Sequence, residues 1–89
     1  MDKKTYLAVI DPAMKLVVSK HEDYNSGIAL DDYFPFLDAS YIHMLNTKVL
    51  RLRSLYGRAA NHEGQLDTVY DLINYAVFYA KYLQEKDKL

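Results

Sequence analysis

The segment from residue 65 to residue 85 constrains the fold most, because it is apolar around most of a helical circumference. One stripe recurs at three- and four-residue steps and consists of Leu66, Val69, Tyr70, Ile73, Val77 and Ala80. A second stripe beside it consists of Leu72, Tyr75, Tyr79 and Tyr82. A helix of this kind is buried from several sides. The pattern therefore predicts a homo-oligomer, with Tyr75, Tyr79 and Tyr82 insufficiently covered within one chain.

A second helix is predicted between two boundary signals. Asp38 or Ser40 can cap its start, and Gly57 ends it. The stripe between them recurs at helical spacing and consists of Tyr41, Met44, Leu45, Lys48, Leu52, Leu55 and Tyr56. Residues 61–64 are predicted to form the turn before the last helix, which then runs over about 65–85.

The N-terminal region predicts a further helix with two alternative beginnings. Asp11 followed by Pro12 is typical of an N-cap and a first helical residue, which indicates a helix up to about Tyr24. Residues 3–10 are either a helical segment kinked at Pro12 or a short extended arm. The sequence thus predicts an all-α fold with a single helical domain over residues 1–89. This domain is a small helical hairpin or three-helix unit that oligomerises, with an arm or short helix at 1–11.

Composition excludes several classes of protein. The chain has no cysteine, so neither disulfides nor thiolate metal sites are expected, and a reducing cytoplasm suits it. The apolar run from Tyr6 to Ile10 is too short for a signal-peptide core or a membrane span. A net charge of −1 provides no field for extended nucleic acid. We therefore expect a cytoplasmic protein with no membrane and no extended nucleic acid among its partners.

Three cations share one face of the second predicted helix. Lys48, Arg51 and Arg58 are spaced by three and seven residues, whereas Arg53 is turned away. Guanidinium groups bind phosphate or carboxylate through two parallel hydrogen bonds. The three cations are therefore candidates for binding the phosphates of a ligand. Alternatively, in an antiparallel hairpin they form salt bridges with acidic residues of the last helix.

Two carboxylates and an amide share one face of the last predicted helix. Asp67, Asp71 and Asn74 lie at i, i+4 and i+7. Carboxylates so spaced can share a Mg²⁺ ion, with water and phosphate oxygens as its remaining ligands. Asp67 and Asp71 are thus candidate metal ligands, and Asn74 is a candidate ligand contact. Alternatively, this face is a solvated strip or pairs with the basic helix; Mg²⁺ is a cofactor that the pattern allows but does not require.

An aromatic connector links the first and second predicted helices. The segment 28–37 contains Tyr33-Phe34-Pro35-Phe36, which Pro35 keeps out of regular helix. This segment is either a hydrophobic plug for the open end of a helical hairpin or a wall over a planar ligand. In the second case Tyr24, Tyr33 or Phe36 is the candidate to stack on a base.

Three motifs in order resemble a known family. Residues 20–25 read KHEDYN, residues 48–55 read KVLRLRSL and residues 67–76 read DTVYDLINYA. This order resembles the phage nucleotide-modification-associated domain family, whose members carry K-x-x-D-Y, K-x-x-R-L and D-T-x-x-D-L-x-N-Y segments. The match covers roughly residues 15–83. The resemblance implies nucleotide chemistry in a bacteriophage setting, and hence the cytoplasm of an infected bacterial host.

The last motif is also similar to the second metal-binding helix of the all-α nucleoside triphosphate pyrophosphatases. In those enzymes a Glu-x-x-Asp pair precedes an apolar run; Asp71 matches the aspartate, and Thr68 stands in place of the glutamate. The glutamate-rich other half of that site has no counterpart here beyond Glu22 and Asp23. In-line attack on a phosphoryl group generally needs several carboxylates. Binding without hydrolysis is therefore favoured over catalysis.

Three functions are compatible with these patterns. The favoured one is a non-catalytic nucleotide binder, similar in size and helicity to small oligomeric phage proteins that sequester the second messengers of bacterial defence. In it, Lys48, Arg51 and Arg58 bind phosphates while an aromatic residue stacks on the base. The second is a Mg²⁺-dependent nucleotide pyrophosphatase or an accessory of phage nucleotide modification. The third is a protein-interaction module that uses the tyrosine-rich last helix.

Overall fold

The described part of the chain forms three α helices and one short 3₁₀ helix. The computed structural model describes residues 1–23, 30–58 and 62–88, apart from the side chains of residues 19–23, 62 and 63. The elements are α1 (Lys3–Asp23), η1 (Leu30–Tyr33), α2 (Asp38–Leu55) and α3 (His62–Asp87). The described residues contain no strand, so the all-α prediction is confirmed.

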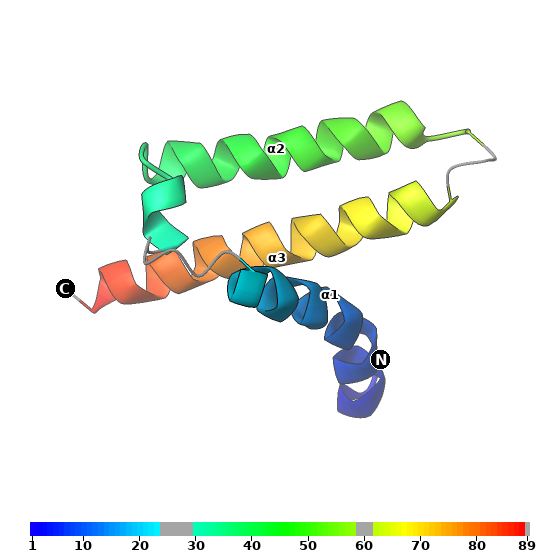
Figure 1. Cartoon of the computed structure of the whole chain (residues 1–89), viewed down its shortest axis with the longest axis horizontal. Helices are drawn as coiled ribbons and strands as arrows, with labels where there is room; N and C mark the ends of the chain where they lie inside the picture. The colour runs from blue at the N-terminus through cyan, green and yellow to red at the C-terminus, as the bar shows by residue number, and fades with distance from the viewer. Residues whose placement is uncertain (24–29, 59–61, 89) are drawn as a thin grey trace.

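The helix α3 is the central element of the fold. It forms an antiparallel hairpin with α2, and it also contacts α1 (Figure 1). In this view α1 lies on the side of α3 opposite to α2. Only the C-terminal part of α1 follows α3, whereas its N-terminal part projects away from the hairpin. A central position agrees with the wide apolar circumference of α3.

The beginning of α1 differs from the main sequence prediction. The backbone N–H of Thr5 donates a hydrogen bond to Oδ1 of Asp2 at 2.8 Å, so Asp2 caps the first turn. The helix then continues through Pro12. Of the two alternatives for residues 3–10, the helical one is right and the extended arm is wrong. Asp11 is therefore inside the helix, where its Oδ2 lies 2.9 Å from Nζ of Lys15, one turn further on.

The helix α2 begins and ends where the sequence predicts, but neither Asp38 nor Ser40 caps its start: the N-cap residue is Leu37, and no side chain accepts a capping hydrogen bond. A tight turn precedes the helix, in which the N–H of Ala39 donates to the carbonyl oxygen of Phe36 at 3.2 Å. Leu37 has φ 56° and ψ −129° there, a conformation of type II′ turns that glycine usually adopts. Oγ of Ser40 accepts a hydrogen bond from the N–H of Phe36 at 2.8 Å. Gly57, with φ 80°, follows the end of α2.

The helix α3 begins earlier than predicted. Its first turn contains His62 and Gly64, which the sequence analysis assigned to a connecting turn. Nε2 of Gln65 donates to the carbonyl oxygen of Leu55 at 3.4 Å, so the first turn of α3 packs against the last turn of α2. Packing thus extends the helix over residues whose local preference is for a turn.

An aromatic cluster forms the core at the open end of the hairpin. Tyr41 of α2 stacks on Phe34 with a distance of 4.1 Å between the ring centres. The α3 rings around this pair are Tyr75, Phe78, Tyr79 and Tyr82. Tyr75, Tyr79 and Tyr82 are thus partly covered within one chain, and each stays at intermediate exposure. This cover arises because the connector folds Phe34 back onto α3, as the plug interpretation predicted for this segment.

Burial is nevertheless small for a chain of this size. The buried apolar side chains among the described residues are Ala13, Phe34, Tyr41 and Leu55. The accessible surface is 7133 Å² for a mass of 10.4 kDa, whereas a compact monomer of that mass exposes about 5,400 Å². The radius of gyration is 14.7 Å, against about 12 Å for a compact chain of this length. Uncovered apolar surface is therefore present, but away from the tyrosine stripe.

Candidate functional site

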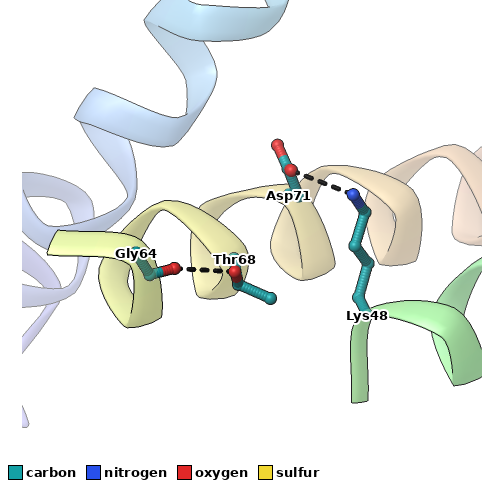
Figure 2. Close-up of polar contacts among 4 residues, drawn as sticks. All are labelled: Lys48, Gly64, Thr68 and Asp71. Atoms are coloured by element: carbon teal, nitrogen blue, oxygen red, sulfur yellow. Dashed lines mark hydrogen bonds and ion pairs between the residues drawn. The ribbon is translucent and has the colours of Figure 1, made fainter. Parts of the chain in front are cut away.

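The centre of the candidate site is an ion pair between α2 and α3. Nζ of Lys48 lies 3.2 Å from Oδ2 of Asp71 (Figure 2). The exposed fractions of the two side chains are 22% and 32%, so the pair is half-buried. Nζ of Lys48 also lies 5.8 Å from the centre of the Tyr75 ring, within the range of a cation–π interaction. These contacts hold the ammonium group in one place beside α3.

Arg51 and Asp67 flank this ion pair. The helices α2 and α3 are antiparallel. The turn of α2 that follows Lys48 therefore lies on the same side of the ion pair as the turn of α3 that precedes Asp71. Arg51 and Asp67 occupy these two turns, toward the closed end of the hairpin. Both side chains are exposed, and neither forms an ion pair with a described residue. We call Lys48, Arg51, Asp67 and Asp71 the polar quartet.

The predicted contact between the basic and acidic helices is therefore only partly formed. It is confirmed for Lys48 and Asp71. Arg58, which follows the α2 terminus directly after Gly57, is exposed and has no ion-pair partner among the described residues. Arg51 and Arg58 thus keep their guanidinium groups available to an anionic ligand.

Asn74 holds α1 on α3. Its Nδ2 donates a hydrogen bond to the carbonyl oxygen of Ala13 at 3.0 Å, and Ala13 is fully buried. Asp71 and Asn74 share one face of α3, as predicted, but this face lies between two neighbours. Asp71 contacts α2 and Asn74 contacts α1. The side-chain amide of Asn74 therefore binds α1 to α3.

Thr68 occupies the position at which the similar pyrophosphatase helix carries a glutamate. It is buried, and its Oγ1 donates to the carbonyl oxygen of Gly64 at 2.7 Å (Figure 2). The hydroxyl group is thus directed to the backbone of its own helix and adds no anionic ligand to the quartet. Tyr75 was predicted to belong to the oligomer surface and not to this site, although its spacing of four residues from Asp71 places both on one face.

The acidic residues of the site are few. Within the described parts of the chain, no three histidine, aspartate or glutamate side chains are grouped so that they could hold a metal ion. Asp67 and Asp71 lie on successive turns, and one oxygen of Asp71 faces Lys48. A Mg²⁺ ion at these two carboxylates would need water or phosphate oxygens for its other positions. The Mg²⁺ site stays a prediction.

The aromatic residues predicted to stack on a base lie at the other end of α2. Tyr33 and Phe36 are exposed, and with His43 and Met44 they line a hollow of about 260 Å³. At 1.5 Å per residue, the helix rise from Asp38, the first residue of α2, to Arg51 is about 20 Å. A mononucleotide on the quartet therefore does not reach these rings within one chain. The third predicted aromatic residue, at position 24, lies outside the described residues.

Comparisons with known proteins do not extend these observations. The chain matches no family model, no curated protein and no solved structure. None of the helices in the described ranges combines the length and the hydropathy needed to cross a membrane. Function is therefore inferred from the residues of the site and their geometry.

Proposed function

We propose that the chain binds the phosphate groups of a nucleotide-type ligand at the polar quartet, without hydrolysing it. It does so as a homo-oligomer in the cytoplasm of an infected bacterium. The observation that carries the proposal is the pairing at the centre of the quartet. Asp71 holds Lys48 at 3.2 Å, while Arg51, one turn away, has no ion-pair partner among the described residues. A positioned ammonium and an available guanidinium on one face suit the oxygens of a phosphate.

The position of the quartet supports this proposal. It lies where two of the three segments that resemble the phage nucleotide-modification family meet, residues 48–55 of α2 and residues 67–76 of α3. The closed end of the hairpin also exposes Arg53 and Arg58. Local positive charge raises the concentration of anions at such a surface even when the net charge of the chain is near zero.

Binding is favoured over hydrolysis because of the carboxylate count. Metal-assisted attack on a phosphoryl group uses several carboxylates to hold metal and orient water. The quartet supplies Asp67 and Asp71, and Asp71 also neutralises Lys48. Thr68 stands where the pyrophosphatase helix carries a glutamate, and its hydroxyl group donates a hydrogen bond to the carbonyl oxygen of Gly64.

Isothermal titration calorimetry with a matched pair of variants tests the proposal. The ligands are nucleoside triphosphates and cyclic mono- and dinucleotides, each with and without Mg²⁺. Arg51→Ala is expected to weaken binding by about 1.5 to 3 kcal/mol, the range for a lost charge-assisted hydrogen bond. Arg53→Ala is the control, because a step of two residues turns Arg53 to the other side of α2. Both arginines are exposed, so circular dichroism should show both variants folded.

The alternatives give different results. Ligand recovered after denaturation of the protein is expected to be chemically unchanged. Turnover of a ligand that disappears in Asp71→Asn would contradict the non-hydrolysing binder and support the pyrophosphatase. Equal loss of affinity in Arg51→Ala and Arg53→Ala would contradict a site at the quartet. Absence of both binding and turnover for every ligand would favour the protein-interaction module, to which the uncovered apolar surface would then belong.

A further inference from the structure

The helix α1 carries an apolar stripe beside the face that contacts α3. Ala13 is fully buried and marks the side of α1 that contacts α3. Leu7, Met14 and Val18 lie about 100° to 140° around the helix from Ala13. Their exposed fractions are 50%, 53% and 52%. We call these three residues the outer stripe; one chain leaves each of them half-exposed.

The N-terminal part of α1 lacks a sufficient reason to be helical within one chain. It contains Thr5, Tyr6, Val9 and Ile10, which are weak helix formers, and it reaches Pro12. Isolated helices shorter than about 12 to 15 residues are marginal in water. Figure 1 shows this part projecting away from the hairpin. Packing against a surface outside the chain would therefore stabilise this part of α1.

The outer stripe is complementary to a second, antiparallel copy of itself. A twofold axis that passes between residues 12 and 13 places Leu7 opposite Val18 of the second copy, because both lie equally far from the axis. Self-complementarity of this kind is what a twofold interface requires.

The amount of uncovered surface agrees with a second copy as the occupant. The chain exposes about 1,700 Å² more than a compact monomer of its mass. A standard stable interface takes about 800 Å² from each partner. The excess is thus large enough for one such interface per chain, with surface remaining for further contacts.

We propose that α1 forms the seam of a twofold dimer, in which the outer stripe packs against the outer stripe of a second copy in antiparallel orientation. This seam specifies the surface through which the proposed homo-oligomer assembles. It does not require a bound nucleotide, so it stands or falls separately from ligand binding at the quartet.

Disulfide trapping tests the orientation of the seam, and the natural chain contributes no competing thiol because it has no cysteine. The double variant Leu7→Cys/Val18→Cys is expected to oxidise to a covalent dimer. Within one helix the two positions are about 16 Å apart, too far for an internal disulfide, which needs Cα atoms within about 7 Å. The controls Leu7→Cys and Val18→Cys are expected to stay uncrosslinked, since an antiparallel seam keeps identical positions apart. Crosslinking of a single variant, or none of the double variant, overturns the proposal.

Light scattering on a second pair of variants tests the seam without cysteine. Met14→Glu places a charge at the centre of the outer stripe and is expected to reduce the mass of the assembly at least twofold at micromolar concentration. Val77→Glu makes the same change at a similarly exposed position of α3, where 58% of Val77 is accessible, and should leave the mass unchanged. Circular dichroism establishes that both variants are folded. Equal masses for Met14→Glu and the natural chain, or a natural chain at 10.4 kDa, contradict the seam.

Discussion

Tyr41 gives the sharpest test of how the core is held together. It is buried, it stacks on Phe34 with ring centres 4.1 Å apart, and its hydroxyl donates a hydrogen bond to Oδ1 of Asp31 at 3.2 Å. Burial, reinforced by this hydrogen bond and by the charge of Asp31, raises the pKa of Tyr41 to about 12. In the unfolded chain the pKa of a tyrosine is about 10. The hydroxyl group should therefore link stability to alkaline pH.

The sign and size of this effect follow from proton linkage. Below about pH 10, Tyr41 is protonated in both states and its full contribution to stability is present. Between about pH 10 and pH 12 the unfolded chain loses this proton while the folded chain keeps it. At about 1.4 kcal/mol per pH unit, the free energy of unfolding should fall by about 2 to 3 kcal/mol over this range.

Urea unfolding of Tyr41→Phe beside the natural chain measures this quantity at a fixed protein concentration. Near neutral pH the variant should be less stable by about 1 kcal/mol, the value of the lost hydrogen bond. It lacks the alkaline loss, so the two curves of unfolding free energy against pH should cross between about pH 10 and pH 12. The control is Tyr56→Phe, because 86% of Tyr56 is exposed. Curves that remain parallel up to pH 12 would refute a buried, hydrogen-bonded Tyr41.

Three further changes test other parts of the fold by chemical denaturation or hydrogen exchange. Leu37→Gly should raise the free energy of unfolding by about 1 kcal/mol, because glycine relieves the backbone strain at φ 56° at a smaller entropic cost; a loss would mean that the half-exposed leucine packs on something. A double-mutant cycle of Lys48→Met and Asp71→Asn should give a coupling energy of about 1 kcal/mol, as for a half-buried pair, and zero coupling would deny the pair at 3.2 Å. Asn74→Ala should cost about 1 kcal/mol and speed amide exchange in α1 by releasing its bond to Ala13; unchanged exchange would show that this bond does not hold α1.

The candidate site could be read in part from the sequence. The periodicity of residues 48–58 and 67–74 placed the charged side chains on helix faces, and the short connection between the helices favoured an antiparallel hairpin. The Lys48–Asp71 ion pair is the contact that this reasoning predicts. The separation of Phe36 from Arg51 was also available from the sequence, because the whole second helix lies between them. This separation is incompatible with the prediction that Phe36 and Arg51 contact one mononucleotide within a single chain.

Other features depended on contacts between distant segments. Nothing in the local sequence shows that Phe34 folds back to cover the α3 tyrosines, because that depends on the direction in which η1 and Pro35 lead the chain. The start of α3 moved upstream for a similar reason, since the Gln65 hydrogen bond to Leu55 forms only when the hairpin closes.

The sequence by itself determined the helices, their main boundary at Gly57 and the deficit of intrachain burial. Each of these follows from local backbone preference or from the amount of apolar surface in a short chain. The tertiary structure alone decided where the deficit lies. Packing of Phe34 and Tyr41 on α3 partly covers the tyrosine stripe, and the bond from Asn74 to Ala13 orients α1. Much of the apolar surface left over is on α1, where Tyr6, Leu7, Val9, Met14 and Val18 are each at least half-exposed, because the main neighbour of this helix is α3 alone.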